Sequence, residues 1–244
     1  MNLIVLAAGP SDLFQNTIQK YPKPLIEING RTIIDRVVEN LTHLYTHCDN
    51  IIFIIKKSDN QKFHLKNVIN LLVPQSLVVE VSGETAGAAC TSLLAIEHLD
   101  DDKPLVITNG DQIIDTNYLN ILDAFKDSKA DAGAVVFNSV HPRWSYVKVN
   151  NDGDVVESAE KNPISNTATA GFYLYKKASI FSKFAKQMIM KDASVDGNFY
   201  ICPVFNEMIL SQKIIKTFSI ESQQYHSFMS PEMLINYKEF LNEK

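Results

Sequence analysis

The order of apolar segments in the first half of the chain limits its possible folds more than any other feature. Several short runs are apolar on both faces, which is typical of strands buried inside a parallel sheet. They occupy residues 3–8, 50–56, 77–81 and 104–111. Segments with helical spacing of apolar residues separate them, at 31–45, 62–72 and 87–99. This alternation predicts an α/β fold with a parallel, doubly wound sheet.

The second half of the chain has shorter strand-like segments, separated by turns. They span 133–139, 144–150, 154–160, 168–177 and 213–221, with helices expected at 181–190, 205–212 and 230–242. The NDGD sequence at 151–154 predicts a hairpin turn, and Ser230 followed by Pro231 predicts the start of the last helix. The change in pattern divides the chain into 1–130 and 131–244. Because no linker sequence separates them, both halves are expected to share one core.

Charge and composition argue against several function classes. The formal net charge is −5, whereas a nucleic-acid surface would be basic. No run approaches the roughly 18 apolar residues that span a bilayer, and the N-terminus lacks the basic region of a signal peptide. The cysteines are Cys48, Cys90 and Cys202, too far apart in sequence to indicate a zinc cluster or a disulfide framework. These features predict a cytoplasmic protein.

The first strand ends in a glycine-containing loop that is followed by a stiff lysine segment. Glycine lets a backbone approach a ligand closely, and the amides after it can form an anion-binding nest. The residues concerned are Leu6, Ala7, Ala8, Gly9, Pro10 and Ser11. In PKPL at 22–25, prolines restrict the backbone on either side of Lys23, which suits a phosphate-binding cation. A plain strand-to-loop turn and a solvated lysine are the alternatives.

The segment 104–111 ends in a carboxylate, Asp111, at the edge where ligands bind in such sheets. The sequence there is NGDQ, with Asn109 and Gly110 preceding Asp111. Mg²⁺ prefers one or two carboxylates together with phosphate oxygens and water. Asp111 is therefore a candidate Mg²⁺ ligand, and an Asx turn is the alternative.

Two further turns contribute candidate binding residues. GETAGAACTSLLA at 83–95 places Thr85, Gly87 and Ala88 before a helix. Small side chains leave room for a flat ring, and a helix N-terminus favours an anion, although tight packing explains Ala88 equally well. AEKNP at 159–163 ends a strand with Glu160 and Lys161. A carboxylate suits sugar hydroxyls and a lysine suits a phosphate, but the two can also form a surface ion pair.

Six motifs in one order resemble the sugar-1-phosphate nucleotidyltransferases. They are LAAG at 6–9, PKPLIEINGRTII at 22–34, GETAGAACTSLLA at 83–95, NGDQ at 109–112, EKNP at 160–163 and ATAGFYLY at 168–175. WSYVKV at 144–149 and EKNPISNTAT at 160–169 resemble a bacterial subgroup found in surface-polysaccharide pathways. The resemblance covers nearly the whole chain. It implies a GT-A-like, Rossmann-like fold, in which helices flank a mixed, mainly parallel sheet in a single domain with a smaller β-rich substrate subdomain.

The resemblance also implies a reaction and its residues. A phosphate oxygen of a sugar 1-phosphate, or of a similar phosphorylated small molecule, would attack the α-phosphorus of an NTP and release pyrophosphate. The half 1–130 would bind the nucleotide, through the 6–14 loop, Lys23 and the 83–87 turn, with Mg²⁺ on Asp111. The half 131–244 would bind the acceptor through Trp144, Tyr146, Glu160, Lys161, Asn166 and Gly171. Lys23, Asp111 and Lys161 would be the catalytic residues.

The sequence departs from the family pattern at two places. The family loop reads AGxGxRF, but this chain has AGPSDLF, with Leu13 where an arginine grips the phosphates. Lys20 and Arg31 are candidate replacements. Near the C-terminus, Ser227 stands where many relatives carry a second metal-binding aspartate. His226 is then a candidate metal ligand, or a capping or surface residue.

Three functions stay open from the sequence. An active nucleotidyltransferase is favoured by PKPL and EKNP, because these motifs suit a triphosphate and a phosphate monoester. A metal-dependent GT-A glycosyltransferase would use a nucleotide-sugar, with Asp111 and His226 at its metal site. A nucleotide-binding homologue with impaired catalysis is favoured by Leu13 alone. The sequence specifies neither the nucleobase nor the acceptor, and it is compatible with a homo-oligomer.

Overall fold

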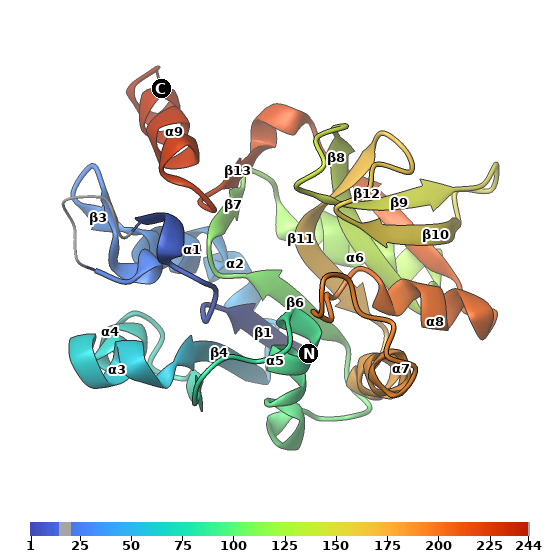
Figure 1. Cartoon of the computed structure of the whole chain (residues 1–244), viewed down its shortest axis with the longest axis horizontal. Coiled ribbons are helices and arrows are strands. Elements are labelled where there is room, and N and C mark those ends of the chain that lie inside the picture. Colours follow the sequence, from blue (N-terminus) through green and yellow to red (C-terminus); the bar gives the residue numbers. More distant parts are fainter. Residues whose placement is uncertain (15–20, 244) are drawn as a thin grey trace.

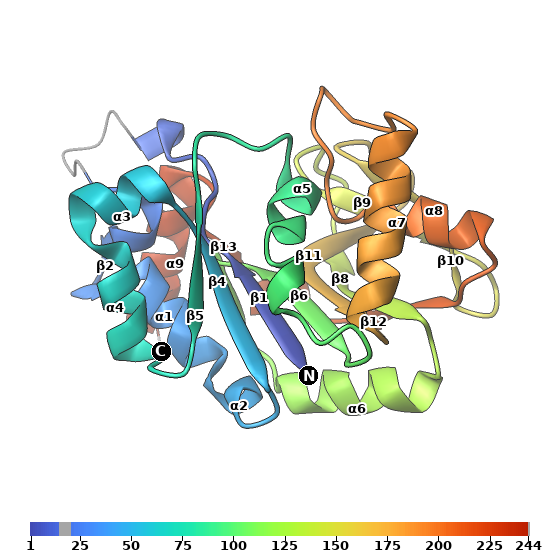
Figure 2. The same cartoon turned by 90° about the horizontal axis from the view of Figure 1, so that it is seen from below.

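A computed structural model describes residues 1–14 and 21–243 of the chain. Within these residues a nine-stranded sheet runs through the molecule, and helices cover both of its faces (Figure 1, Figure 2). The continuous strand order is β10-β9-β11-β6-β1-β4-β5, while β8 pairs with β11 and with β12. The expected α/β fold, with a mixed sheet flanked by helices, is confirmed.

The N-terminal part of the sheet is parallel. Its strands are β1 Asn2–Leu6, β4 Asn50–Lys56, β5 Leu77–Val81 and β6 Leu105–Asn109. β1 lies between β4 and β6, with Leu6 opposite Ile54 on one side and Asn109 on the other. The carboxyl ends of β1 and β6 therefore meet at one edge, where a ligand site is expected in such sheets.

The C-terminal strands extend the sheet with mostly antiparallel pairs. They are β8 Ala132–Asn138, β9 Ser145–Val149, β10 Val155–Glu160, β11 Thr167–Tyr175 and β12 Ile215–Ser219. β11 lies antiparallel beside β6, and the β9–β10 hairpin contains the turn predicted at 151–154. The register of β11 shifts between Thr169 and Tyr173. This irregularity contains Gly171, next to the end of β6.

Helices pack on both faces because successive apolar residues along the strands point to opposite faces of the sheet. Leu3 and Val5 of β1 belong to a buried cluster with α1, α4, α6 and α9, whereas Ile4 belongs to a second cluster with α5, α7 and α8. The α-helices are α1 Ile33–Asn40, α2 Thr42–Tyr45, α3 Lys57–Phe63, α4 Leu65–Leu72, α5 Ala88–Leu93, α6 Tyr118–Ser128, α7 Ala178–Met190, α8 Val204–Leu210 and α9 Pro231–Glu243. Each cluster draws residues from both sides of position 130. The division into 1–130 and 131–244 stays a prediction about roles.

Short elements complete the edge of the sheet near the end of β6. Two-stranded sheets join β2 Glu27–Ile28 to β3 Arg31–Thr32 and β7 Gln112–Ile114 to β13 Tyr225–Ser227. The 3₁₀ turns are η1 Asp12–Phe14, η2 Lys23–Leu25, η3 Ile96–His98 and η4 Ser222–Gln224. The β7–β13 pair brings the C-terminal part of the chain beside the residues that follow β6.

Some helix predictions need correction. The segment 31–45 is divided at Leu41, and in 62–72 the helix α4 starts only after His64, which has a left-handed φ of 54°. The segment 87–99 gives only α5 and η3. In α5, Thr91 and Ser92 donate to the carbonyls four residues earlier, and such bonds bend or weaken helices.

The starts of two other helices carry clear capping signals. The sequence pattern did not predict α6, although the Asn117 side chain caps it by accepting from Leu119 N at 3.0 Å. The predicted start of α9 is confirmed, since it begins at Pro231 and Ser230 Oγ accepts from Met233 N at 3.4 Å. Among the residues described, none of the helices combines the length and apolar character needed to cross a membrane.

Candidate functional site

Lys23 and Asp111 form an ion pair where β1 and β6 end. The Lys23 Nζ lies 2.6 Å from Asp111 Oδ2, and the two side chains are 7% and 19% exposed. The pair is therefore largely shielded from water, while the carboxylate keeps an open side. The structure thus brings together two of the three residues predicted to be catalytic.

The loop after β1 wraps around this lysine. Pro22, with φ −65°, and Pro24 restrict the backbone of η2. Ser11 Oγ accepts a hydrogen bond from Lys23 N at 3.1 Å, and a Cβ on Gly9 would lie 3.4 Å from Lys23 Nζ. The loop predicted to bind phosphate and the lysine predicted to assist it therefore form one unit.

Gly110 lets the ends of the two strands approach each other. Its amide donates to Leu6 O at 2.8 Å. A Cβ at this position would lie 2.9 Å from Leu6 O and 3.0 Å from Ala7 Cβ, which real side chains avoid. From the other side, Phe228 N donates to Asp111 O at 2.7 Å. The backbone of Asp111 is thus held independently of its contact with Lys23.

A polar network supports the turn from the irregular part of β11. Gln112 Nε2 donates to Gly171 O at 3.0 Å, and Asn109 Nδ2 donates to Gln112 Oε1 at 3.3 Å. Gly171 has φ 59°, and a Cβ there would lie 2.2 Å from Asn109 Nδ2. Asn109 and Gly171, predicted as ligand contacts, are therefore also part of the support beneath the site.

A segment from far along the chain closes the predicted base-binding turn. Gly87 has φ 99°. Phe199 N donates to Ala86 O at 2.8 Å, and Phe199 O accepts from Ala89 N at 2.9 Å. A Cβ on Gly87 would lie 2.6 Å from Phe199 O. Glycine is required here because the backbone of Phe199 occupies the place of a side chain.

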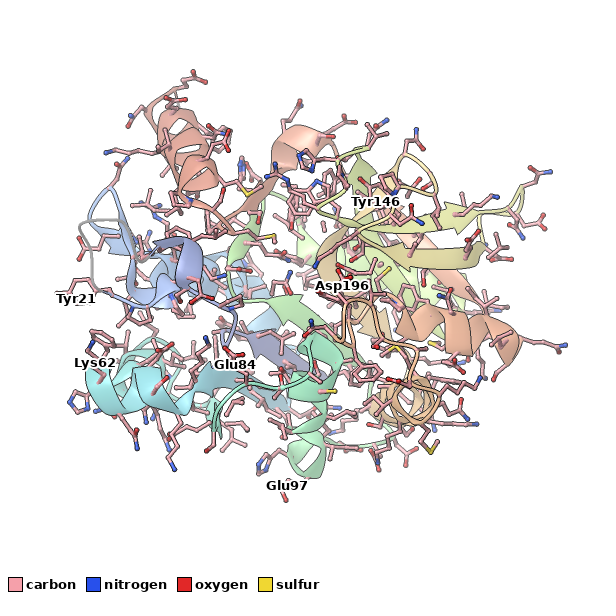
Figure 3. All side chains as sticks on the ribbon, viewed as in Figure 1. Tyr21, Lys62, Glu84, Glu97, Tyr146 and Asp196 are labelled. Carbon is pink, nitrogen blue, oxygen red and sulfur yellow. The ribbon has the colours of Figure 1, made fainter. Side chains whose placement is uncertain are left out.

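Thr85 and Ala88 flank Gly87. The hydroxyls of Thr85 and Thr91 share a hydrogen bond of 2.6 Å, and Ala88 is a partly buried residue of the second cluster. Figure 3 labels Glu84 on this turn and Asp196 on the segment between α7 and α8. The Thr85 hydroxyl therefore has a partner within the turn, and Ala88 packs against the second cluster.

Glu160 is a buried carboxylate at the end of β10. It is 9% exposed and accepts a hydrogen bond from the Ser145 hydroxyl. Burial raises the pKa of its carboxyl group, and the Ser145 hydrogen bond opposes this effect. Glu160 lines a cavity of about 480 Å³ between β10, α8 and residues 193–195. A hydroxyl-rich group would find both an acceptor and space there.

Lys161 has different surroundings from its neighbour Glu160. Its backbone is left-handed, with φ 53°. Its Nζ lies 5.3 Å from the centre of the Tyr200 ring and 3.9 Å from Asp196 Oδ2. A hydrogen bond with Tyr200 raises the pKa of the Lys161 ammonium group. Lys161 is not in contact with Asp111 in the described structure; its partners come from the segment after α7.

The other predicted acceptor residues differ in exposure. Trp144 is partly buried, with its ring centroid 5.5 Å from that of Tyr225, and Asn166 is exposed. Tyr146, labelled in Figure 3, has no exposed surface, and its hydroxyl donates to His141 O at 2.6 Å. Trp144 and Asn166 therefore remain accessible to a ligand, whereas Tyr146 supports β9 from within the core.

Comparison with known proteins decides the family. Residues 3–207 match the family model described as "Nucleotidyl transferase". The chain belongs to the nucleotidyl transferase family. The resemblance drawn from the six motifs is confirmed at the level of the family, while the bacterial polysaccharide subgroup stays a prediction.

Relatives of this chain differ in length and in name. It is 30% identical over 217 residues to the bifunctional protein GlmU of Methanocaldococcus jannaschii, covering 88% of this chain and 48% of that protein. It is 24% identical over 183 residues to the UTP–glucose-1-phosphate uridylyltransferase AglF of Haloferax volcanii, covering 73% of each. The chain thus spans about half the length of the GlmU relative.

Solved structures share the fold at lower identity. The nucleoside-diphosphate-sugar pyrophosphorylase of Vibrio cholerae RC9 has a TM-score of 0.85 and 22% identity, covering 97% of this chain and 99% of that one. The inositol-1-phosphate CTP transferase of T. maritima has a TM-score of 0.76 and 16% identity, covering 99% and 94%. The arrangement of sheet and helices is therefore shared with these structures over nearly the whole chain.

The loop predicted to bind phosphate lacks the arginine of the family pattern. Leu13, at the arginine position, is 67% exposed. Arg31, one candidate replacement, is engaged by Asp35 Oδ2 at 2.7 Å and by Glu39 Oε2 at 2.6 Å. Lys20, the other candidate, lies outside the described residues. Arg31 would have to leave both carboxylates before it could take the place of the missing arginine.

His226 lies in an aromatic environment. Its ring centroid is 4.9 Å from that of Tyr237 and 4.4 Å from that of Phe240, both on α9. Ser227, at the family's aspartate position, is buried, and its backbone pairs with β7. Within 1–14 and 21–243, no three His, Cys, Asp or Glu side chains are grouped as a metal site. These contacts give His226 a packing role and do not join it to the Asp111 carboxylate.

The segment 191–203 carries contacts that no sequence motif indicated. Val195 and Asn198 exchange backbone hydrogen bonds of 2.9 and 3.0 Å, and between them Asp196 and Gly197 have φ 51° and 74°. An Asp-Gly pair is a known signal for such a tight turn. The Asp-Gly signal identifies the turn. It does not indicate that Phe199 contacts the turn around Gly87 or that Tyr200 contacts Lys161.

Proposed function

We propose that this chain transfers the nucleoside monophosphate of an NTP to a phosphorylated small molecule, in the first instance a sugar 1-phosphate, and releases pyrophosphate. The product would be an activated precursor for a surface polysaccharide. The observation that carries the proposal is the 2.6 Å contact between Lys23 and Asp111 at the joint end of β1 and β6. A cation and a carboxylate at this edge suit a triphosphate and a divalent ion.

In this scheme Asp111 would hold Mg²⁺. The donor set fits, because Mg²⁺ in nucleotide sites is usually bound by one or two carboxylates together with phosphate oxygens and water. The Asp111 side chain is 19% exposed, so one side is open to a ligand. When bound, the ion would neutralise phosphate charge. Lys23 would share its own charge between Asp111 and the phosphates, and the amides after Gly9 would donate to phosphate oxygens.

The residues of the chain would act by positioning and by neutralising charge. An acceptor phosphate oxygen forms a bond to the α-phosphorus, the bond from the α-phosphorus to the bridging oxygen breaks, and its electron pair leaves with pyrophosphate. The acceptor phosphate is already an anion, so no side chain has to remove a proton. Lys23 and Lys161 would offset the charge of the approaching groups. Glu160, with Trp144 and Asn166, would orient the acceptor.

Leu13 favours a second function, a nucleotide-binding homologue with impaired catalysis. Its apolar side chain is 67% exposed in the phosphate loop, and Arg31 is held by two carboxylates. Loss of a group that stabilises transition-state charge commonly costs about 10²–10³-fold in rate. On this alternative, the chain binds NTP and releases no pyrophosphate.

Release of pyrophosphate tests both functions. The full chain is incubated with Mg²⁺, each common NTP, and a panel of sugar 1-phosphates and choline phosphate, while calorimetry measures nucleotide binding separately. Release that requires both NTP and acceptor supports the transfer reaction. Nucleotide binding without pyrophosphate release in every combination supports the impaired homologue. If the chain neither binds nucleotide nor releases pyrophosphate, both functions are contradicted. Free NDP formed from a nucleotide-sugar and an acceptor would instead support a glycosyltransferase.

A further inference from the structure

Two consecutive residues, Phe199 and Tyr200, contact both of the proposed substrate sites. The backbone of Phe199 donates to Ala86 O at 2.8 Å and accepts from Ala89 N at 2.9 Å, on either side of the nucleotide turn. The ring of Tyr200 lies 5.3 Å from the Nζ of Lys161, on the acceptor side. Adjacent residues therefore contact the proposed nucleotide site and the proposed acceptor site.

The segment that carries these residues is anchored at several points. Phe199, Ile201 and Cys202 are only 8%, 4% and 0% exposed, and Cys202 O accepts from the Ser158 hydroxyl of β10 at 3.0 Å. The segment lies beside the start of α5 in both ribbon views (Figure 1, Figure 2). Since close-packed interiors transmit strain, a shift at the Phe199 backbone would also shift the neighbouring Tyr200 ring.

Lys161 depends on this segment for its restraint. Its side chain is 44% exposed, and its carboxylate neighbour Asp196 is 77% exposed and 3.9 Å away. An ion pair of that length and exposure contributes little. The Tyr200 ring offers a cation–π contact and limits where the long side chain can go. A lysine restrained in advance loses less rotamer freedom when it binds a phosphate.

We infer that Phe199 and Tyr200 couple the two substrate sites, so that nucleotide bound at the 85–89 turn improves the placement of Lys161 and tightens acceptor binding. Tyr200 is in this sense a positioning residue, which acts through Lys161. The coupling rests on the proposed function, because both sites are defined by it. Thermodynamic linkage requires that the acceptor tighten nucleotide binding by the same factor.

Calorimetry on the full chain with Mg²⁺ tests this coupling. The probes are α,β-methylene-UTP, which cannot be cleaved at the reacting bond, and glucose 1-phosphate, or the corresponding pair that the pyrophosphate assay selects. Each probe is titrated alone and in the presence of the other. The wild-type chain is expected to bind the acceptor at least about fivefold more tightly with nucleotide present, within the usual range of coupling between sites.

Four variants test whether the coupling depends on Tyr200 and Lys161. Tyr200→Leu should bring the affinity ratio close to unity without changing the affinity for nucleotide alone. Tyr200→Phe keeps the ring and should retain most of the coupling. Asp196→Asn removes a charge from the same segment while leaving the ring, and is the matched control with unchanged coupling. Lys161→Met, at an exposed position, should abolish coupling even if Tyr200→Leu folds poorly.

The outcomes separate this inference from the proposed function. Full coupling in Tyr200→Leu or in Lys161→Met, or no coupling in the wild-type chain when both probes bind, overturns the inference and leaves the transfer reaction intact. Failure of the wild-type chain to bind any nucleotide probe overturns the proposed function itself. In turnover assays, Tyr200→Leu should raise KM for the acceptor at saturating nucleotide and, by the same linkage, KM for the NTP at saturating acceptor.

Discussion

The two lysines proposed to flank the reaction are held in different ways. The Lys23 side chain is 7% exposed and lies 2.6 Å from a carboxylate oxygen. The Lys161 side chain is 44% exposed, with its carboxylate neighbour 3.9 Å away and the centre of the Tyr200 ring 5.3 Å away. Burial and a short ion pair order Lys23 before any ligand arrives, whereas Lys161 keeps part of its freedom.

The difference follows from where each lysine sits in the fold. Lys23 packs against the joined ends of two parallel strands, where Gly9 and Gly110 permit close approach of backbone and side chains. Lys161 follows an edge strand and meets a segment between two helices. Loops on a rigid scaffold commonly determine ligand choice. We therefore expect the surroundings of Lys23 to be nearly rigid and the acceptor side to determine which phosphorylated molecule is used.

Asp111→Asn should produce the largest effect on the rigid side. Loss of the carboxylate charge removes the proposed metal ligand and should lower pyrophosphate release by roughly 10²–10³-fold or more. The fold should survive, because Phe228 N still donates to the backbone carbonyl of residue 111. Asp192→Asn, at an exposed position, is the control. Turnover within a few-fold of wild type would remove Asp111 from the metal site.

Gly87→Ala should be the most disruptive change at the junction between the two sides. A Cβ at Gly87 would lie 2.6 Å from Phe199 O, whereas a Cβ at Gly83, which is also at positive φ, would meet nothing within 4 Å. Gly87→Ala should therefore lower the free energy of unfolding by about 1–3 kcal/mol more than Gly83→Ala. Urea denaturation of the two variants measures the difference, and equal losses would show that the Phe199 contact is dispensable.

Leu13→Arg would give the loop after β1 the cation that the family pattern has at this position. Because Leu13 is 67% exposed, the change should not disturb packing. A charge-assisted hydrogen bond to a phosphate contributes about 1.5 kcal/mol, which corresponds to roughly a tenfold rise in kcat/KM. Leu13→Gln, which is polar but uncharged, is the control. If arginine and glutamine give the same rate, the missing charge does not limit the proposed reaction.

Glu160→Gln should have the smallest effect, and one that depends on pH. Burial raises the pKa of Glu160 above the ordinary value of 4.5, so the folded state binds this proton more tightly than the unfolded chain does. The stability that protonation contributes is present below that ordinary value and is lost as pH rises through the folded value. The Tm of Glu160→Gln should therefore rise relative to wild type across this window, by a few degrees.

Calorimetric scans at a series of pH values from acid to neutral measure this relative change. Glu157→Gln, an exposed neighbour on the same strand, should show no such trend. A difference between Glu160→Gln and wild type that stays constant with pH would mean that burial of the carboxylate has no energetic consequence in this range.

Parts of the fold that depend on neighbours in sequence could be predicted well. The strand at 50–56 has the predicted bounds, because a strand buried on both faces must be apolar throughout. The strand at 77–81 also has the predicted bounds, although it lies at the edge of the sheet and is only partly buried. The cap at Ser230 and the stiff segment around Lys23 are likewise local. The division of 62–72 at His64 was not predicted, since a left-handed residue inside a helical pattern has no strong signal when it is not glycine.

Parts that depend on distant contacts could not be predicted. The pairing of β13 with β7, which fixes the backbone beside Asp111, joins segments more than a hundred residues apart. The contacts of Phe199 with the turn at 86–89 and of Tyr200 with Lys161 arise in the same way. Motifs indicated which residue types carry the chemistry, whereas the restraints on them come from tertiary packing.

Diffraction from crystals grown with Mn²⁺ and an uncleavable NTP analogue most directly tests whether Lys23 and Asp111 form one site for a polyphosphate and a metal. The anomalous signal of Mn²⁺ identifies its position independently of the protein. We predict Mn²⁺ bound to the Asp111 carboxylate and to a phosphate oxygen, with Lys23 Nζ in hydrogen-bonding distance of the phosphates. Mn²⁺ bound elsewhere, or phosphates remote from Lys23 with nucleotide clearly present, would contradict it.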